Sequence, residues 1–141
     1  MKPIWKKPIS LEWLAQISDG SLVSHLGIEF LEIGPDFLRA RMPVDSRTKQ
    51  PIGLLHGGAS VALAETVAST ASHCCVDEEH YCVGIEINAN HVRKVKSGWV
   101  EALARPLHLG QSTHVWEMQV TDENGLLIST CRMTLSVLEI N

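Results

Sequence analysis

A single carboxylate, Glu65, interrupts a long apolar stretch of this 141-residue sequence. It is the only Asp, Glu, Lys or Arg between Lys49 and Asp77, and residues 57–75 predict one long buried helix. A lone carboxylate there costs several kcal/mol unless it is paired, hydrogen-bonded or protonated. The residues alone leave two interpretations open: a desolvated general base or nucleophile, or a structural carboxylate paired with a basic residue of another element or chain.

The sequence His56-Gly57-Gly58 lies immediately before this helix, and the histidine precedes Glu65 by nine residues. Two glycines let the backbone approach a ligand closely, and the first amides of a helix are donors without intrahelical acceptors. The positive end of the helix dipole lies behind them, which suits an oxyanion. The alternative is a helix start at which the glycines only relieve crowding.

Two further polar residues flank this arrangement. Ser69 follows Glu65 by one helical turn on the same face, so its hydroxyl could hold an attacking water or orient the carboxylate. Serine in a packed helix can instead bond back to the preceding turn. Gln50 lies near the end of a polar loop over residues 43–55 and carries no signal by itself.

The segment His91-Val92-Arg93-Lys94-Val95-Lys96 places four possible cations at the end of a predicted strand. On an extended chain His91 and Arg93 share one face, and the two lysines share the other. Such a strip suits phosphate groups, and it equally suits a solvated strand edge that lysine protects from aggregation. Both interpretations remain open.

Five potential zinc ligands occur within residues 73–82, where His73-Cys74-Cys75 is followed by His80 and Cys82. The spacing contains no Cys-x2-Cys pair, and adjacent cysteines on a helix point in divergent directions. We therefore expect reduced thiols near a helix end and no metal site.

Periodicity around the long helix predicts an α+β domain. A short helix capped by Ser10 is followed by a strand with Leu26, Ile28 and Phe30. A second strand forms a hairpin with the first and precedes the long helix. This second strand spans residues 38–42, and the later strands are expected at 83–92, 98–107, 113–120 and 126–138, the last two joined at Asn124-Gly125. A single apolar helix requires a concave antiparallel sheet around it, so residues 1–141 are expected to form one domain.

Composition narrows the class of protein. Hydrophobic residues make up 45% and charged residues 20%, which disfavours disordered and fibrous chains. A net charge of −4 with few aromatic residues makes nucleic acid an unfavourable partner. We expect no membrane span and, because no cationic segment leads into an apolar one at the start, a cytoplasmic protein. P-loop, dinucleotide and Gly-x-Ser-x-Gly signatures are missing.

The combination of His-Gly-Gly, a glutamate nine residues later and four following strands resembles the hotdog-fold acyl-CoA thioesterases. The resemblance extends over nearly the whole chain. It is most specific in Met42–Pro51, Gly53–Ser60, Glu86–His91 and Pro106–Gly110. It implies a hotdog fold, in which an antiparallel sheet wraps around one long central helix, and an acyl-CoA substrate with no separate cofactor, since CoA is part of that substrate.

The resemblance also implies catalytic roles. Glu65 matches the family's catalytic carboxylate, which acts either as a nucleophile through a mixed anhydride or as a general base on water. Gln50 and His56 match side chains beside the thioester carbonyl, the Gly57 amide matches the oxyanion donor, and Ser69 matches a hydroxyl near the attacking water. In this family the site lies between two subunits of a dimer, which assembles further into a tetramer.

Coenzyme A contacts carry over by the same resemblance. They fall on Gly84, on His91, Val92, Arg93 and Lys94, and on His108, Leu109, Gly110, Gln111, Ser112 and Thr113. Gln111-Ser112-Thr113 lacks the arginine that members of the family often carry there, so one phosphate contact departs from the pattern.

The resemblance implies hydrolysis of an aromatic acyl-CoA, with 1,4-dihydroxy-2-naphthoyl-CoA of menaquinone synthesis as the expected substrate. Asn90 favours this branch, because thioesterases that clear misloaded aroyl groups from a siderophore-synthesis carrier protein tend to have threonine there. That proofreading activity is one alternative. A non-enzymatic acyl-CoA-binding module is another, and a hotdog dehydratase would be expected to place its histidine in a proline-rich turn.

Overall fold

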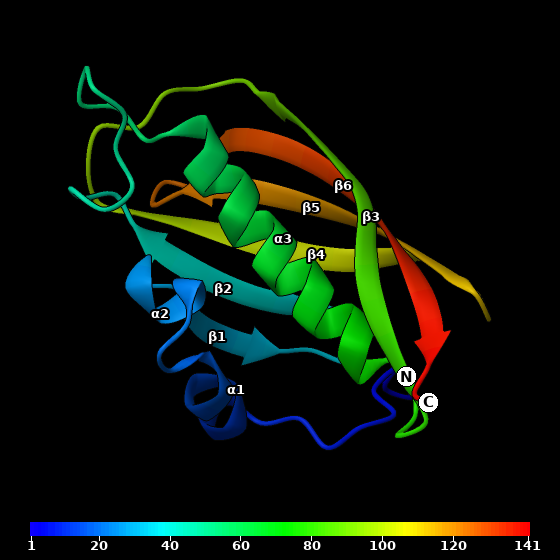
Figure 1. The fold of residues 1–141 in the computed structure, drawn as a ribbon. Coiled ribbons are helices and arrows are strands. Elements are labelled where there is room, and N and C mark those ends of the chain that lie inside the picture. The colour runs from blue at the N-terminus through cyan, green and yellow to red at the C-terminus, as the bar shows by residue number, and fades with distance from the viewer.

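Alternating apolar residues build a curved sheet, and a run of small residues builds the helix that it surrounds (Figure 1). The computed structural model describes residues 1–141. Its elements are α1 (Leu11–Ser18), α2 (Leu22–His25), β1 (Glu29–Ile33), β2 (Leu38–Pro43), α3 (Gly57–Cys74), β3 (His80–His91), β4 (Trp99–Leu109), β5 (Thr113–Asp122) and β6 (Leu127–Glu139).

All six strands belong to one sheet in the order β1-β2-β4-β5-β6-β3, and every neighbouring pair is antiparallel. The sheet curves around α3, which lies across its concave face (Figure 1). The predicted α+β class, with a single long helix against an antiparallel sheet, is confirmed. β1 and β3 are the two edges, and β3 has 12 residues against 5 in β1.

Small side chains let α3 approach the sheet closely. Leu63, Ala64, Val67, Ala68 and Ala71 are fully buried, and their spacing of three and four residues defines one face of the helix. Burying a leucine or valine side chain contributes about 1.5–3 kcal/mol, so this face stabilises the position of α3 on the sheet. No helix of the chain has the length and apolar character needed to cross a bilayer.

The prediction that α3 is buried all round is wrong for this chain. The sheet covers one side of the helix, and α1 and α2 flank the other side only in part. Glu65 lies on that open side and is exposed to solvent. The sequence predicts a carboxylate shielded from water, but a single chain leaves Glu65 in contact with solvent.

The start of the first strand was also predicted incorrectly. Residues 22–25 form α2, with the Ser21 hydroxyl accepting a hydrogen bond from the Val23 amide at 3.2 Å. Gly27 then adopts a φ of 74°, which glycine tolerates far better than other residues. The chain can thus turn sharply into β1, which begins at Glu29.

The later strands follow the sequence prediction more closely. β3 begins at His80 and ends at His91, so residues 92–96 lie beyond the strand. The predicted alternation of faces along the cationic segment is therefore wrong. The Asn124-Gly125 turn does join β5 to β6, and Gly125 has a φ of 79°.

The cysteines near the end of α3 are free and mostly buried. Burial raises the pKa of the Cys74 thiol to about 11 and that of Cys75 to about 12, so both stay protonated at neutral pH. The structure contains no group of three or more His, Cys, Asp or Glu side chains that could hold a metal ion.

A buried histidine on β5 predicts acid sensitivity. His114 is 2% exposed, and its Nδ1 lies 2.6 Å from the Ser72 hydroxyl of α3. Burial, followed by the nearby charges of His108 and Lys6, lowers the pKa of His114 below its ordinary value of 6.5. The unfolded chain therefore binds the proton more readily, and stability must fall as the pH drops below about 6.5.

We expect the urea midpoint to decrease between about pH 7.5 and pH 5.5, and to decrease less in His114→Asn than in the unsubstituted protein. The substitution can also lower stability through lost packing. That loss is present at every pH, so it cancels when the changes in the urea midpoint with pH are compared. Equal decreases in both proteins would show that His114 does not carry the effect.

Candidate active site

His56 begins α3 and makes one side-chain contact that fixes its chemistry. It occupies the N-cap position, and its Nδ1 accepts a hydrogen bond from the Gly58 amide at 2.8 Å. A ring nitrogen that accepts a hydrogen bond carries no proton, so in the neutral imidazole the proton lies on Nε2. His56 can therefore donate a hydrogen bond from Nε2 to a ligand at the helix start.

The amide of Gly57 is a second donor at this point. It has no hydrogen-bond acceptor within the chain, whereas the next amide, that of Gly58, is taken by His56. A Cβ atom on Gly57 would lie 2.9 Å from Nε2 of His91, so glycine keeps the space around this amide open. The free N–H lies at the positive end of the α3 dipole, where an oxyanion is stabilised.

Gln50 supplies a third donor. Its side-chain oxygen accepts hydrogen bonds from the amides of Ile52 and Leu54 at 2.7 and 3.4 Å. These contacts fix the orientation of the side-chain amide and leave its NH2 group without an acceptor in the chain. Gln50, Gly57 and His91 line the same hollow, which has a volume of about 440 Å³.

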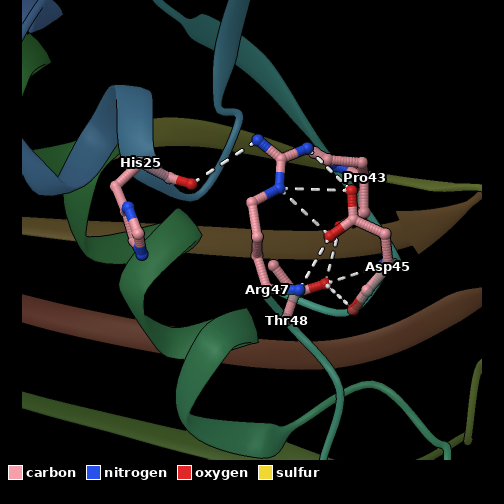
Figure 2. Close-up of polar contacts among 5 residues, drawn as sticks. All are labelled: His25, Pro43, Asp45, Arg47 and Thr48. Carbon is pink, nitrogen blue, oxygen red and sulfur yellow. Dashed lines mark hydrogen bonds and ion pairs between the residues drawn. The ribbon is translucent and has the colours of Figure 1, made fainter.

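The loop that carries Gln50 is held by a polar cluster (Figure 2). The Asp45 carboxylate accepts from the Arg47 guanidinium at 2.7 Å, and this contact lowers the pKa of Asp45. The buried hydroxyl of Thr48 donates to the Pro43 carbonyl at 2.7 Å, while the Thr48 carbonyl accepts from the His56 amide at 2.8 Å. The cluster thereby connects the end of β2 directly to the N-cap of α3.

Glu65 and Ser69 lie together on the open side of α3. They line a hollow of about 350 Å³ with Leu22 and Val23 of α2 and with Thr66. Neither side chain makes an ion pair or hydrogen bond within the chain, whereas Thr66 bonds back to the Ala62 carbonyl. The predicted proximity of Glu65 and Ser69 is confirmed, and Ser69 does not bond back to the preceding turn.

A glycine on β3 gives Glu65 its space. A Cβ atom on Gly84 would lie 3.7 Å from Oε2 of Glu65 and 2.6 Å from the methyl group of Met133. The strand bulges at this point, because the pairing with β6 shifts between Gly84 and Glu86. The bulge leaves Ile85 63% exposed on the outer edge of the sheet.

The donors and the carboxylate of one chain lie too far apart to act together. Gly57 and Glu65 are separated by about 12 Å along the axis of α3. They contact β3 at His91 and Gly84, positions about 23 Å apart along the strand. A reacting carbonyl must lie about 3 Å from both its donor and its attacking atom, so one chain holds two incomplete halves of a site.

The predicted coenzyme A contacts are similarly divided. Val92, Arg93 and Lys94 line the hollow at the start of α3 together with His91. The β4–β5 hairpin, with residues 108–113, lies at the opposite end of the sheet, near the C-terminal end of α3. Within one chain the structure therefore does not bring these two groups together.

Comparison with known proteins identifies the family. The model of the Thioesterase superfamily matches residues 52–129, which include α3 and the strands that surround it. The chain belongs to the thioesterase superfamily. Its curved sheet around α3 is thus the hotdog fold, as the resemblance implied, and the unpaired carboxylate and amide donors belong to a thioester hydrolase.

Several thioesterases are similar over almost their entire length. The 1,4-dihydroxy-2-naphthoyl-CoA hydrolase of Escherichia coli is 51% identical, covering 96% of this chain and 99% of the relative. The proofreading thioesterase EntH of Cronobacter turicensis is 48% identical, covering 96% and 98%. The crystal structure of thioesterase HI1161 from Haemophilus influenzae has a TM-score of 0.95 at 50% identity, covering 96% and 95%.

The candidate site has lining residues that the sequence did not indicate. Leu22 and Val23 form the wall opposite Glu65, and they were missed because α2 has only four residues and no helical periodicity to detect. The serine at position 21, followed by two apolar residues, was the available signal, since serine is a preferred helix cap.

Proposed function

We propose that this thioesterase hydrolyses aromatic acyl-CoA thioesters, with 1,4-dihydroxy-2-naphthoyl-CoA as the main substrate. Water and the thioester are consumed, and the free acid and CoA are released. The observation that carries the proposal is the free Gly57 amide, which complements the unpaired carboxylate of Glu65. The relative from Escherichia coli supports the choice of acyl group.

The complete site is proposed to form between two copies of the chain. β3 is a long edge strand whose outer backbone groups are unpaired. Ile85 of this strand is 63% exposed, and Val92, directly after its end, is 58% exposed. An edge of this kind is suited to pairing with another strand. Pairing of β3 with β3 of a second copy around a two-fold axis satisfies both edges at once.

This pairing brings the separated halves together. In an antiparallel β3 pair, the His91 end of one strand lies beside the first half of the other strand, which contains Gly84. Gly57 is next to His91 and Glu65 is next to Gly84. The donors of one copy therefore face the carboxylate of the other, and the same pairing shields Glu65 from solvent. A tetramer would be built from two such dimers.

The chemistry then divides between the two copies. Gln50, His56 and the Gly57 amide of one copy bind the thioester oxygen and stabilise the negative charge that develops on it. Glu65 of the other copy accepts a proton from water as the water oxygen attacks the carbonyl carbon, with Ser69 orienting that water. When the C–S bond breaks, the carboxyl group returns the proton to the departing thiolate.

A covalent route uses the same residues. The Glu65 carboxylate attacks the carbonyl carbon, the thiolate leaves, and water then hydrolyses the mixed anhydride. In both routes the coenzyme A portion is proposed to contact Gly84, residues 91–94 of one copy and residues 108–113. Coenzyme A enters as part of the substrate, so no further cofactor is required.

Release of free thiol from a panel of acyl-CoA esters tests the proposal. The panel should contain 1,4-dihydroxy-2-naphthoyl-CoA, aliphatic acyl-CoAs and a carrier protein loaded with dihydroxybenzoyl groups. We expect the naphthoyl ester to give the highest kcat/KM. A higher kcat/KM for the loaded carrier would contradict the proposed substrate and would favour the proofreading activity that the Cronobacter relative suggests. Saturable binding without turnover would indicate an acyl-CoA-binding module.

A further inference from the structure

A hollow larger than the two described above lies at the C-terminal end of α3, away from Glu65. Its volume is about 530 Å³, and its walls include Lys2, Trp5, Lys6, Gly110 and Gln111. Residues 108–113 comprise the end of β4, the turn at 110–112 and the first residue of β5. Apart from His108, none of these hairpin residues can carry a positive charge, so the hairpin alone offers little to a phosphate group.

The N-terminal segment beside this hairpin is held firmly in place. The Trp5 indole donates to the Gly34 carbonyl at 2.8 Å, and the Lys6 amide donates to the Cys74 carbonyl at 2.8 Å. The Lys7 ammonium group donates to the His73 and His80 carbonyls at 2.9 and 3.2 Å. These contacts fix the backbone of Lys6 at the rim of the hollow.

The charges in the hollow favour an anion. Lys2 and Lys6 make no ion pair, and Asp77 is the only carboxylate in the lining. Asp77 is already bonded to Nδ1 of His80 at 2.6 Å, a contact that also lowers the pKa of Asp77. The lining therefore carries two ammonium groups against one carboxylate, and that carboxylate also attracts Lys6.

The position of the hollow relative to Glu65 suits an extended substrate. Cys75 lines the hollow and follows Glu65 by about 15 Å along the helix direction. On the sheet, Val137 of β6 lines the hollow, and it is two residues from Leu135, the partner of Gly84. A pantetheine arm that starts at the carboxylate and passes Gly84 therefore leads towards this hollow.

We propose that Lys6, assisted by Lys2, binds a phosphate of the nucleotide portion of the acyl-CoA substrate. This inference rests on the proposed hydrolysis of acyl-CoA esters and adds the residues that hold the phosphate. The hairpin at Gly110 and Gln111 forms the opposite wall. The lysines act on binding alone, because they lie far from the reacting carbonyl.

The test compares two thioesters with the same acyl group, one of CoA and one of pantetheine, which lacks the nucleotide. For Lys6→Ala we expect the KM of the CoA ester to rise about five- to tenfold, with kcat and the KM of the pantetheine ester unchanged. The double variant Lys2→Ala/Lys6→Ala should raise the KM of the CoA ester further. Lys6→Arg should bring this KM close to that of the unsubstituted protein. Arg132→Ala serves as the control, because this exposed cation of β6 lines none of the hollows described above.

Calorimetric binding of adenosine 3′,5′-bisphosphate provides a measurement that does not depend on turnover. Weaker binding to Lys6→Ala than to Arg132→Ala supports the inference, even if the unsubstituted protein hydrolyses no acyl-CoA and the proposed function fails. An unchanged KM for the CoA ester in Lys6→Ala overturns the inference while leaving the proposed function intact. Equal increases in KM for both esters also overturn it, since the nucleotide would not be the group that Lys6 recognises.

Discussion

Glu65→Gln is expected to lower kcat for the best acyl-CoA ester by at least about 10²-fold, because Gln can neither accept the water proton nor form the anhydride. The substitution preserves the size of the side chain. Glu65 is exposed and unpaired within the chain, so the fold and its thermal midpoint should change little. Initial rates and KM, measured with circular dichroism on the same samples, check both parts.

Ser69→Ala is a suitable companion, since Ser69 shares the hollow but is proposed only to orient water. Its loss in kcat should be much smaller than that of Glu65→Gln. A fully folded Glu65→Gln that retains turnover within a few-fold of the unsubstituted protein would exclude Glu65 as base and nucleophile. The carboxylate would then have the structural role left open by the sequence.

Gly57→Pro is expected to lower kcat by about 10²- to 10³-fold, the usual effect of removing one oxyanion donor. Proline lacks the amide hydrogen but is well tolerated at the first position of a helix, which Gly57 occupies after the His56 cap. His56 has φ −69° and ψ 130°, a conformation favoured before proline. The substitution can thus remove the donor without breaking α3.

Gly57→Ala is the control for steric effects. Its Cβ atom approaches His91 as the proline ring would, but the amide hydrogen remains. The difference in kcat between the two variants therefore reports the amide itself. If both variants lose the same activity, crowding against His91 explains the loss and the Gly57 amide is not the oxyanion donor.

The sequence was sufficient to predict the elements with strong local signals. α3 follows from its run of small apolar residues after His-Gly-Gly, and the β5–β6 hairpin follows from Asn124-Gly125. The proximity of Glu65 and Ser69 follows from helical spacing alone. These features depend on residues close in the chain, so periodicity and turn chemistry reveal them.

Features that depend on distant parts of the chain could not be predicted in the same way. The apolar composition of α3 indicated burial on all sides, but the sheet covers one side and leaves Glu65 exposed. Composition does not specify whether the other side of α3 is covered by the same chain or by another copy. The hollow between the N-terminal segment and the β4–β5 hairpin likewise joins residues more than a hundred positions apart, which no local pattern records.

The central claim is that each site uses Glu65 of one copy and the Gly57 amide of another. Mixing Glu65→Gln with Gly57→Pro under conditions that exchange subunits tests it directly. Random association gives about a quarter of the sites both an intact carboxylate and an intact amide, so about a quarter of the unsubstituted activity should return. Activity that stays at the level of the separate variants, with mixed oligomers demonstrated by native mass spectrometry, would contradict a site shared between copies.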